Sequence, residues 1–344
     1  MKSSRHLGSA LLFLLLVALT ACWLLRSVDL PSVLTALHQT KKGYILAAAG
    51  MMVLFTAGEA LKMRFAFDML GQKISYWKCI SFSLVGFYFN AVTPSASGGQ
   101  PAQLYYMKKD GIQISHSTLA LLILALVHLL VMVTYSLLMF LACRSFIMQH
   151  LGAMTPLFLF GVIFNLAIFF FILFVIFSPG AAQRCAMAVL RFLQRLRLVK
   201  NGRKVQEKLR QQIKEYQDSA LLLKKRPFGL CSVSVITVLQ STASFLVPYF
   251  IYKGFSLSGF SILEMIAVQA VLNISVSSLP LPGAVGASEN GFLLLFRTFF
   301  GAQLIFPAML LCRGINFYAL LVFSGIGSLF FYYYLHWHKQ AANS

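Results

Sequence analysis

An apolar segment at residues 79–107 is interrupted in its middle by Thr93-Pro94-Ser95-Ala96-Ser97-Gly98-Gly99-Gln100-Pro101. Proline and glycine end helices, and small polar side chains can hydrogen-bond the backbone groups that such an end releases. The segment begins after Lys78 and ends at Lys108-Lys109, and basic residues gather on the cytoplasmic side of membrane proteins. Since both ends are expected on one side, the sequence predicts a broken, re-entrant helical pair.

A second apolar stretch, residues 262–296, is broken in the same way by Leu279-Pro280-Leu281-Pro282-Gly283-Ala284-Val285-Gly286-Ala287-Ser288-Glu289. It is flanked by apolar segments at 228–252 and 303–335. Each half of the chain therefore reads as span, broken re-entrant pair, span, in opposite orientations. Paired interruptions of this kind in two halves indicate a transporter-type binding site near the bilayer midplane. We expect six residues to act as hinges of the two breaks: Pro94, Gly98, Gly99, Pro282, Gly283 and Gly286.

The composition indicates an integral membrane protein. Of the 344 residues, 59% are hydrophobic and 11% are charged, whereas soluble domains carry roughly 25% charged residues. Further apolar segments lie at 7–25, 44–61, 117–142 and 153–178, and runs of about 18 or more such residues are typical of membrane spans. The fold class predicted is all-α, with about six transmembrane helices and two re-entrant broken helical pairs arranged as an inverted repeat.

The first apolar segment could instead be a signal peptide, since Leu19-Thr20-Ala21-Cys22 resembles a lipoprotein cleavage site. The stretch is long enough to span, and further spans follow it, so we favour an uncleaved first helix. The predicted organisation has four parts. They are the first helix and an interfacial segment at 1–40, a first half at 41–178, a basic region at 179–227 and a second half at 228–338.

Charge is strongly unbalanced, with 29 Lys and Arg against 9 Asp and Glu. No nucleic-acid partner is expected, because no nucleic-acid-binding fold signature accompanies the charge and cytoplasmic loops of membrane proteins collect basic residues. The basic residues concentrate in 184–226. Two amphipathic helices there would lie against the anionic inner leaflet; a solvated helical linker is the alternative. The same rule predicts a multi-pass protein of the cell membrane with both termini cytoplasmic.

Few acidic residues lie near apolar segments, and Glu289 stands out. It follows the second break at the start of a helix, where the free N–H groups and the helix dipole stabilise a carboxylate. Alternatively, Glu289 lines a central cavity and binds a cationic head group or a proton. Arg313 lies about ten residues into the last apolar run, too deep to stay unpaired. It should pair with an acid, for which Glu289 is the candidate, or face water.

Polar residues also mark the first half. Glu59 and Lys62 are three residues apart, so they can pair on one helix face. Either they form an interfacial ion pair, or Lys62 or Arg64 binds a lipid phosphate. Asn90 and Asn273 precede the two breaks, where each could cap freed backbone groups or line a polar cavity.

The helix ends at the breaks expose backbone N–H groups, which attract phosphate. Alternatively, three serines alone cap these ends: Ser95, Ser97 and Ser288. Catalytic motifs are absent from the sequence, and the six cysteines lie far apart. We therefore expect no catalytic residue, no metal and no cofactor.

Two motifs resemble those of a known family. The motif Phe89-Asn90-x-x-Thr93-Pro94-Ser95-x-Ser97-Gly98-Gly99-Gln100-Pro101 resembles the first-half signature of the lysylphosphatidylglycerol synthase transmembrane region, also called the flippase-like family. The motif Leu279-Pro280-x-Pro282-Gly283-x-x-Gly286-x-x-Glu289 resembles its Pro-Gly-Gly-x-Gly-x-x-Glu pattern, with Ala284 where the second glycine often stands. Leu61-x-x-Arg64-Phe65 is similar to its Arg-Trp pair, and Arg313 matches an arginine of its last segment. The resemblance covers roughly residues 7–335.

The resemblance implies a lipid flippase that moves a phospholipid, such as lysyl-phosphatidylglycerol, or a lipid-linked head group between leaflets. Arg64 and Arg313 would bind phosphate, Glu289 would bind a cation or a proton, and the breaks would form the moving seam. In bifunctional relatives a soluble lysyltransferase domain follows; no room for it is left before Ser344, so we expect no enzyme activity. The departures at Gln100 and Ala284 bear on substrate identity. A homo-oligomer or a separate synthase partner is compatible with this hypothesis.

A second hypothesis is a membrane scaffold or regulator that recruits a partner through the basic region. It predicts that charge reversal in 184–226 abolishes function while changes at Glu289 and Arg313 have no effect. Transferase chemistry within the membrane is a third hypothesis, for which the sequence offers no catalytic pair.

Overall fold

The computed structural model describes residues 40–93, 96–178 and 227–341, together with scattered positions at 31–38 and 180–191. Every regular element in this part of the chain is a helix, which confirms the predicted all-α class. The expected first span at 7–25, the hinge residue Pro94 and nearly all of the basic region lie outside the described residues.

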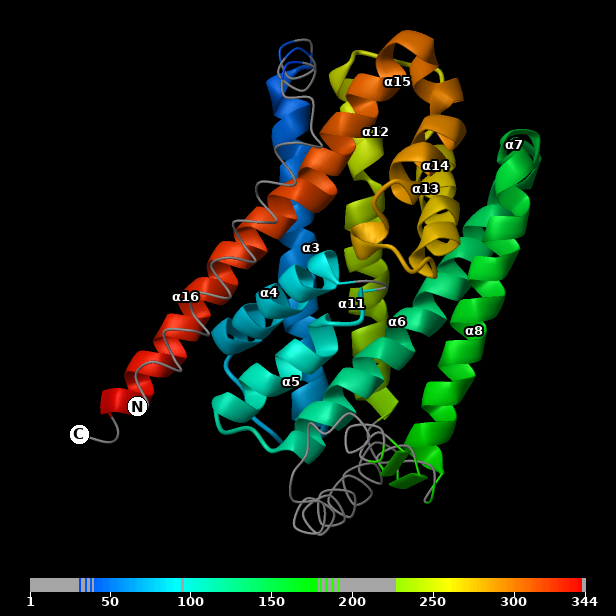
Figure 1. The fold of residues 1–344 in the computed structure, drawn as a ribbon. Coiled ribbons are helices and arrows are strands. Elements are labelled where there is room, and N and C mark those ends of the chain that lie inside the picture. Colours follow the sequence, from blue (N-terminus) through cyan, green and yellow to red (C-terminus); the bar gives the residue numbers. More distant parts are fainter. Residues whose placement is uncertain are drawn as a thin grey trace.

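Five helical segments of the described chain are long and apolar enough to cross a membrane, and they make this a multi-pass membrane protein. They are α3 (Lys42–Met69), α6 (Ile114–Ala142), α8 (Thr155–Phe177), α11 (Pro227–Phe245) continued by α12 (Val247–Gly254), and α15 (Arg297–Arg313) continued to α16 (Leu320–Ala341). In Figure 1, α3, α11 and α12 run through the centre, α6 and α8 lie to the right, and α16 slants away to the lower left. Two short helices, α7 (Arg144–Leu151) and η2 (Gly152–Met154), join α6 to α8.

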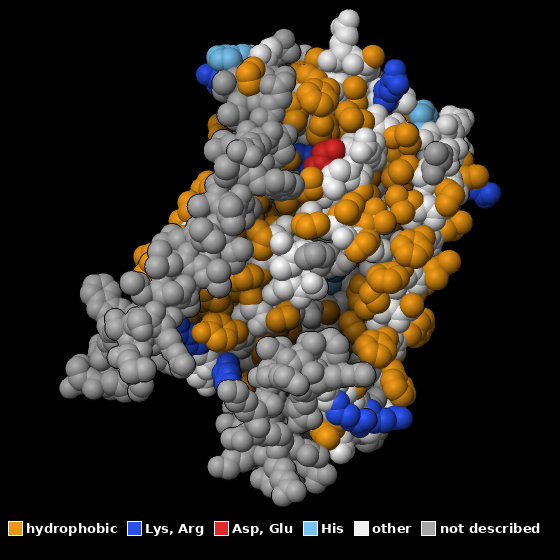
Figure 2. Space-filling view, viewed as in Figure 1, with side chains coloured by type: hydrophobic (Ala, Val, Ile, Leu, Met, Phe, Trp, Pro, Cys, Tyr) orange, Lys and Arg blue, Asp and Glu red, His pale blue; other side chains and the backbone are white. Residues whose placement is uncertain are grey.

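The outer surface is largely apolar, as a lipid-facing surface must be. Large hydrophobic side chains such as Phe170 on α8, Leu239 on α11 and Phe330 on α16 are more than half exposed. In Figure 2 hydrophobic side chains spread over the visible face, and most Lys and Arg side chains lie toward its upper and lower ends. This distribution fits a bilayer whose core covers the middle of the molecule.

The first broken segment consists of α4 (Tyr76–Val92) and α5 (Gly99–Lys109), in the lower half of Figure 1. Two side chains from the end of α4 satisfy the backbone released at the break. Thr93 Oγ1 accepts a hydrogen bond from the Gly98 N–H at 2.9 Å, and Asn90 Oδ1 accepts one from the Gly99 N–H at 3.0 Å. The start of α5 is thus capped from the preceding helix, and serine capping alone does not describe it.

The second broken segment consists of α13 (Ile262–Ser277), the short 3₁₀ turn η3 (Pro282–Ala284) and α14 (Ala287–Leu295). The turn needs left-handed backbone, with φ of +56° at Gly283 and +84° at Gly286, which glycine adopts without steric cost. The two breaks meet, because a Cβ added to Gly283 would lie 3.4 Å from the Ala91 carbonyl oxygen of α4.

Two boundaries differ from the sequence prediction. Helix α3 extends to Met69, whereas the apolar run was expected to end at residue 61. The final segment begins at Arg297, before the expected residue 303, and contains a π-helical turn, η4 (Gly314–Ala319), directly after Arg313. In each of these helices a largely buried basic residue is paired with an acid: Lys62 with Glu59 in α3, and Arg313 with Glu289 in the final segment.

Candidate functional site

A cavity of about 480 Å³ opens among helices α3, α4, α5, α6, α8 and α11. Its size falls in the range of about 300–1,000 Å³ that is typical of small-ligand sites. The lining is unusually polar for the interior of a membrane protein. Ten polar side chains contribute to it: Glu59, Lys62, Ser83, Asn90, Ser97, Gln100, Gln103, His128, Gln240 and Ser241.

A charged pair lies in the wall of this cavity. Lys62 Nζ contacts Glu59 Oε2 at 2.8 Å, one turn away on α3, and Lys62 is only 3% exposed. The same Glu59 oxygen accepts a hydrogen bond from Gln240 Nε2 of α11, also at 2.8 Å. The predicted Glu59–Lys62 pair is confirmed. The pair is anchored by a third side chain from a distant part of the sequence.

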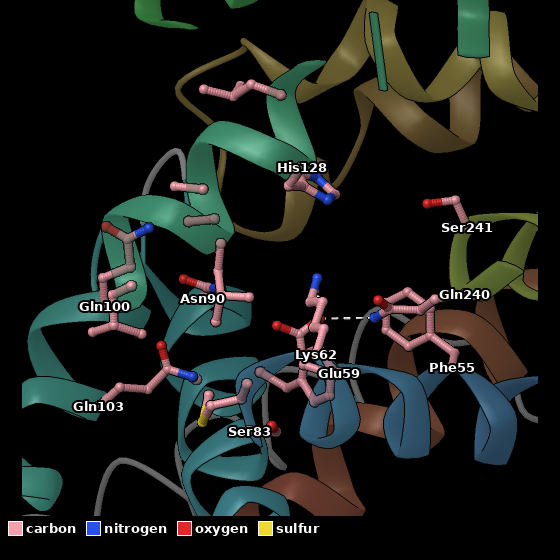
Figure 3. A pocket seen from close by; sticks show the side chains of 18 of the residues that line it. Phe55, Glu59, Lys62, Ser83, Asn90, Gln100, Gln103, His128, Gln240 and Ser241 are labelled. Carbon is pink, nitrogen blue, oxygen red and sulfur yellow. Dashed lines mark hydrogen bonds and ion pairs between the residues drawn. The ribbon is translucent and has the colours of Figure 1, made fainter. Parts of the chain in front are cut away.

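Two buried polar atoms of the cavity residues have no hydrogen-bond partner among the described residues. Ser83 Oγ and Gln240 Oε1 are buried and make no hydrogen bond to any residue that the structure describes. Figure 3 shows the Lys62 amino group pointing into the space between Asn90, His128 and Gln240. Buried polar groups normally have hydrogen-bond partners, so these atoms indicate a place where water or a ligand completes the set.

The first break forms one wall of the cavity. Asn90 lines the cavity from the end of α4, Ser97 from the break and Gln100 from the start of α5. Asn90 therefore does both of the things that its position in the sequence suggested, since it caps Gly99 and also lines a polar cavity. Any movement of α4 against α5 would change the shape of this wall.

A second charged cluster lies at the other break. Arg313 Nε donates to Glu289 Oε1 at 2.7 Å, and Arg313 Nη2 donates to the Gly283 carbonyl oxygen at 3.2 Å. The guanidinium lies 4.4 Å from the centre of the Phe317 ring, within the range of a cation–π contact. Glu289 Oε2 also accepts from the Gly286 N–H at 2.6 Å. The predicted Glu289–Arg313 pair is confirmed, together with the role of Glu289 at the helix start.

The other predicted residues lie apart from the cavity lining. Arg64 is exposed near the end of α3, two residues and about half a turn beyond the cavity residue Lys62, and Asn273 is half-buried on α13. Neither is among the residues that line the cavity, and the same is true of Glu289 and Arg313. Of the residues singled out from the sequence, the structure brings Glu59, Lys62 and Asn90 to the cavity, together with Ser97 and Gln100 of the first-break motif.

Five polar cavity residues were not singled out from the sequence: Ser83, Gln103, His128, Gln240 and Ser241. Gln103 donates from Nε2 to the Phe82 carbonyl oxygen at 3.1 Å, which ties α5 to α4. A signal was available for two of them, because His128 and Gln240 interrupt long apolar helices. A polar residue inside a span is a functional candidate by default.

Comparison with known proteins finds a family model and relatives that are membrane proteins. The family model described as the lysylphosphatidylglycerol synthase TM region matches residues 7–324. A UPF0104 membrane protein of Archaeoglobus fulgidus is 22% identical over 288 residues, which cover 82% of this chain and 84% of that protein. A UPF0104 membrane protein of Methanothermobacter thermautotrophicus is 23% identical over 308 residues, covering 87% of each chain.

Proposed function

This chain belongs to the family of the lysylphosphatidylglycerol synthase TM region, and from that premise we propose that it is a lipid translocase. It moves a phospholipid, such as lysyl-phosphatidylglycerol, or a lipid-linked head group between the leaflets of the cell membrane. The observation that carries the proposal is the polar cavity that holds Lys62 and Glu59 among apolar helices. The proposal assigns no catalytic step to the chain.

The energetics support a transport path. A charge at the centre of a membrane helix costs about 2.5–3.5 kcal/mol on insertion scales, and this cavity retains two charges and eight further polar side chains. A head group that crosses the bilayer needs such groups, because they replace the water that it gives up. A structural ion pair would need neither the open volume nor the unpartnered atoms at Ser83 and Gln240.

In this proposal, the two halves of the chain move against each other at the two breaks. Each half of the chain contains a helix, a break and a second helix, which supports an inverted repeat of re-entrant pairs. Glycine and short capped turns at both breaks allow one half to move against the other. When the Glu289–Arg313 pair opens, Arg313 would receive a lipid phosphate and Glu289 a cation or a proton, and Arg64 would hold phosphate at the end of α3.

Orientation and partners belong to the same proposal. The termini and the basic region 184–226 lie on the cytoplasmic side, with the basic region against anionic lipid, and a homo-oligomer or a separate synthase is compatible with it. Labelling of single cysteines, introduced into a variant whose six native cysteines are replaced, tests the orientation. A cysteine at Lys109 should react only from inside and one at Arg144 only from outside. The reverse pattern would invert the assignment.

The function is tested in liposomes. The purified chain would be reconstituted, and leaflet exchange of fluorescent lysyl-phosphatidylglycerol, phosphatidylglycerol and a polyprenyl-phosphate lipid would be measured. Lys62→Gln removes the positive charge from the cavity lining. Lys78→Gln is the matched control, because Lys78 pairs with Asp110 at 2.8 Å outside the cavity lining. We expect exchange of at least one lipid, reduced by Lys62→Gln and retained in Lys78→Gln.

Failure of every lipid to exchange, with protein shown to be folded, would refute the translocase. It would favour the scaffold hypothesis, under which charge reversal in the basic region 184–226 abolishes function.

A further inference from the structure

We propose that the cavity binds an anionic phosphodiester whose head group carries hydroxyl groups, such as a glycerol- or sugar-phosphate, and selects against a cationic aminoacyl head group. The inference rests on the proposed function and narrows it, since among the lipids named there it favours phosphatidylglycerol or a sugar-phosphate lipid over lysyl-phosphatidylglycerol. It follows from the hydrogen-bond donors and acceptors of the lining that have no partner among the described residues, and from the charge of Glu59.

The donor side of the cavity fits a phosphate. The Lys62 ammonium carries three N–H donors, and one of them is directed to Glu59. Its nitrogen points into the cavity between Asn90 and His128 (Figure 3). Phosphate oxygens are the strongest acceptors that a membrane lipid offers to such an ammonium, so the free donors of Lys62 define a phosphate position.

The acceptor side of the cavity fits hydroxyl groups. Gln240 Oε1 can only accept a hydrogen bond, and it is buried without a donor among the described residues. The Ser83 hydroxyl, 1% exposed, also has no described partner. A ligand that satisfies Gln240 must bring a hydrogen-bond donor as well as the anion, and the hydroxyl groups of a glycerol- or sugar-phosphate supply one without adding positive charge. A choline head group lacks such a donor.

The charge balance disfavours a cation. Glu59 is the only carboxylate among the described residues that line the cavity. Its Oε2 already accepts hydrogen bonds from both Lys62 and Gln240. A lysyl or other aminoacyl head group would meet only the second oxygen of a carboxylate that is already paired, and it would lie beside the Lys62 ammonium. Like charges in a site of low dielectric repel strongly, so this head group should bind more weakly than a neutral polyol.

Equilibrium binding tests the inference without requiring transport. The full chain in detergent would be titrated with a tritiated short-chain phosphatidylglycerol. The competitors would be lysyl-phosphatidylglycerol, phosphatidylcholine and soluble glycerol phosphate. We expect lysyl-phosphatidylglycerol and phosphatidylcholine to compete at least about tenfold more weakly than unlabelled phosphatidylglycerol, the factor that one hydrogen bond to a charged group can supply. Strong competition by glycerol phosphate would show that the cavity binds this head group also in a soluble molecule. Competition by the unlabelled lipid alone would show that the ligand is a lipid.

Three variants locate the binding. Lys62→Gln should weaken phosphatidylglycerol binding at least about tenfold, and Ser83→Ala about threefold to tenfold. Ser83→Ala should leave the melting temperature equal or higher, because it removes a buried hydroxyl that has no described partner. It therefore keeps the test valid if Lys62→Gln fails to fold. Lys78→Gln, outside the cavity lining, should bind like the wild type.

Equal or tighter binding of lysyl-phosphatidylglycerol, or unchanged phosphatidylglycerol affinity in folded Ser83→Ala and Lys62→Gln, would overturn the inference. Its failure is separable from failure of the translocase. Selective binding of phosphatidylglycerol without leaflet exchange would refute transport alone. If lysyl-phosphatidylglycerol binds as tightly as phosphatidylglycerol and exchanges at least as fast, the selectivity alone is refuted.

Discussion

Glu289 Oε1 accepts a hydrogen bond from Arg313 Nε at 2.7 Å, which joins the start of α14 to the end of α15 across 24 positions of sequence. Both side chains are largely buried, at 17% and 14% exposed. The second carboxylate oxygen accepts from the Gly286 N–H. One carboxylate therefore caps the start of α14 and also binds Arg313. Arg313 directly precedes the π-helical turn η4, and π-helical turns are often found at functional sites.

Glu289→Gln should lower lipid exchange without lowering expression. The amide can still accept from Gly286 but loses the charge that holds Arg313. We expect exchange to fall about tenfold, since a hydrogen bond between charged groups contributes about 1.5–3 kcal/mol. The measurement is leaflet exchange at equal protein incorporation. Glu264→Gln is the matched control, because Glu264 makes the same kind of helix cap at Ser261 with no ion pair among the described residues. Unchanged exchange in Glu289→Gln would remove this residue from the mechanism.

Arg313→Lys should destabilise the protein although it keeps the charge. The guanidinium donates to Glu289 and to the Gly283 carbonyl and lies over Phe317, and an ammonium cannot reproduce that planar arrangement. Loss of one hydrogen bond and of the ring contact should cost about 1–3 kcal/mol. Thermal unfolding in detergent measures the change. The same substitution at the exposed Arg297 should have little effect, and equal melting temperatures for both variants would contradict the prediction.

Gly99→Ala should destabilise the first break. An added Cβ would collide with the Asn90 amide, which accepts the Gly99 N–H. We expect a loss of about 1–3 kcal/mol, from the steric clash together with the lost cap. The readout is the unfolding midpoint in detergent. Gly50→Ala serves as control, because nothing lies within 4 Å of its added Cβ and alanine favours a helix interior. A lower midpoint for Gly50→Ala than for Gly99→Ala would refute the argument.

Ala284→Gly should stabilise the second break. Ala284 adopts φ of +51°, which costs a residue with a Cβ about 1–2 kcal/mol. Glycine in turn costs about 0.5–1 kcal/mol, because it loses more conformational freedom on folding, so the net gain should be up to about 1.5 kcal/mol. Denaturation midpoints test this, with Ala287→Gly in the first turn of α14 as a comparison expected to destabilise. A loss of stability in Ala284→Gly would show that the turn is not strained.

The motif at the second break has a backbone explanation. The family pattern that the sequence resembles places glycines at three positions, which correspond here to Gly283, Ala284 and Gly286. All three have positive φ, at +56°, +51° and +84°. Left-handed conformation is what glycine supplies at such positions. The spacing of the motif therefore follows from the geometry of the turn before α14.

The sequence by itself determined the membrane class and the places of both breaks, and it indicated Glu289 as a candidate partner of Arg313. These follow from local properties: apolar length sets a span, proline and glycine end a helix, and a deep arginine needs a partner. The extent of α3 was missed for a related reason, because the apolar run stops near Glu59 while the helix continues to Met69.

Only the tertiary structure decided the cavity. Lys62, His128 and Gln240 come from α3, α6 and α11, and nothing local in the sequence relates them. The helices are apolar on most sides, and in lipid an apolar face does not distinguish the interior from the surroundings. Periodicity therefore could not show which face of each helix points inward. Side-chain packing between helices sets that face, and with it the position of the unpartnered atoms of Ser83 and Gln240.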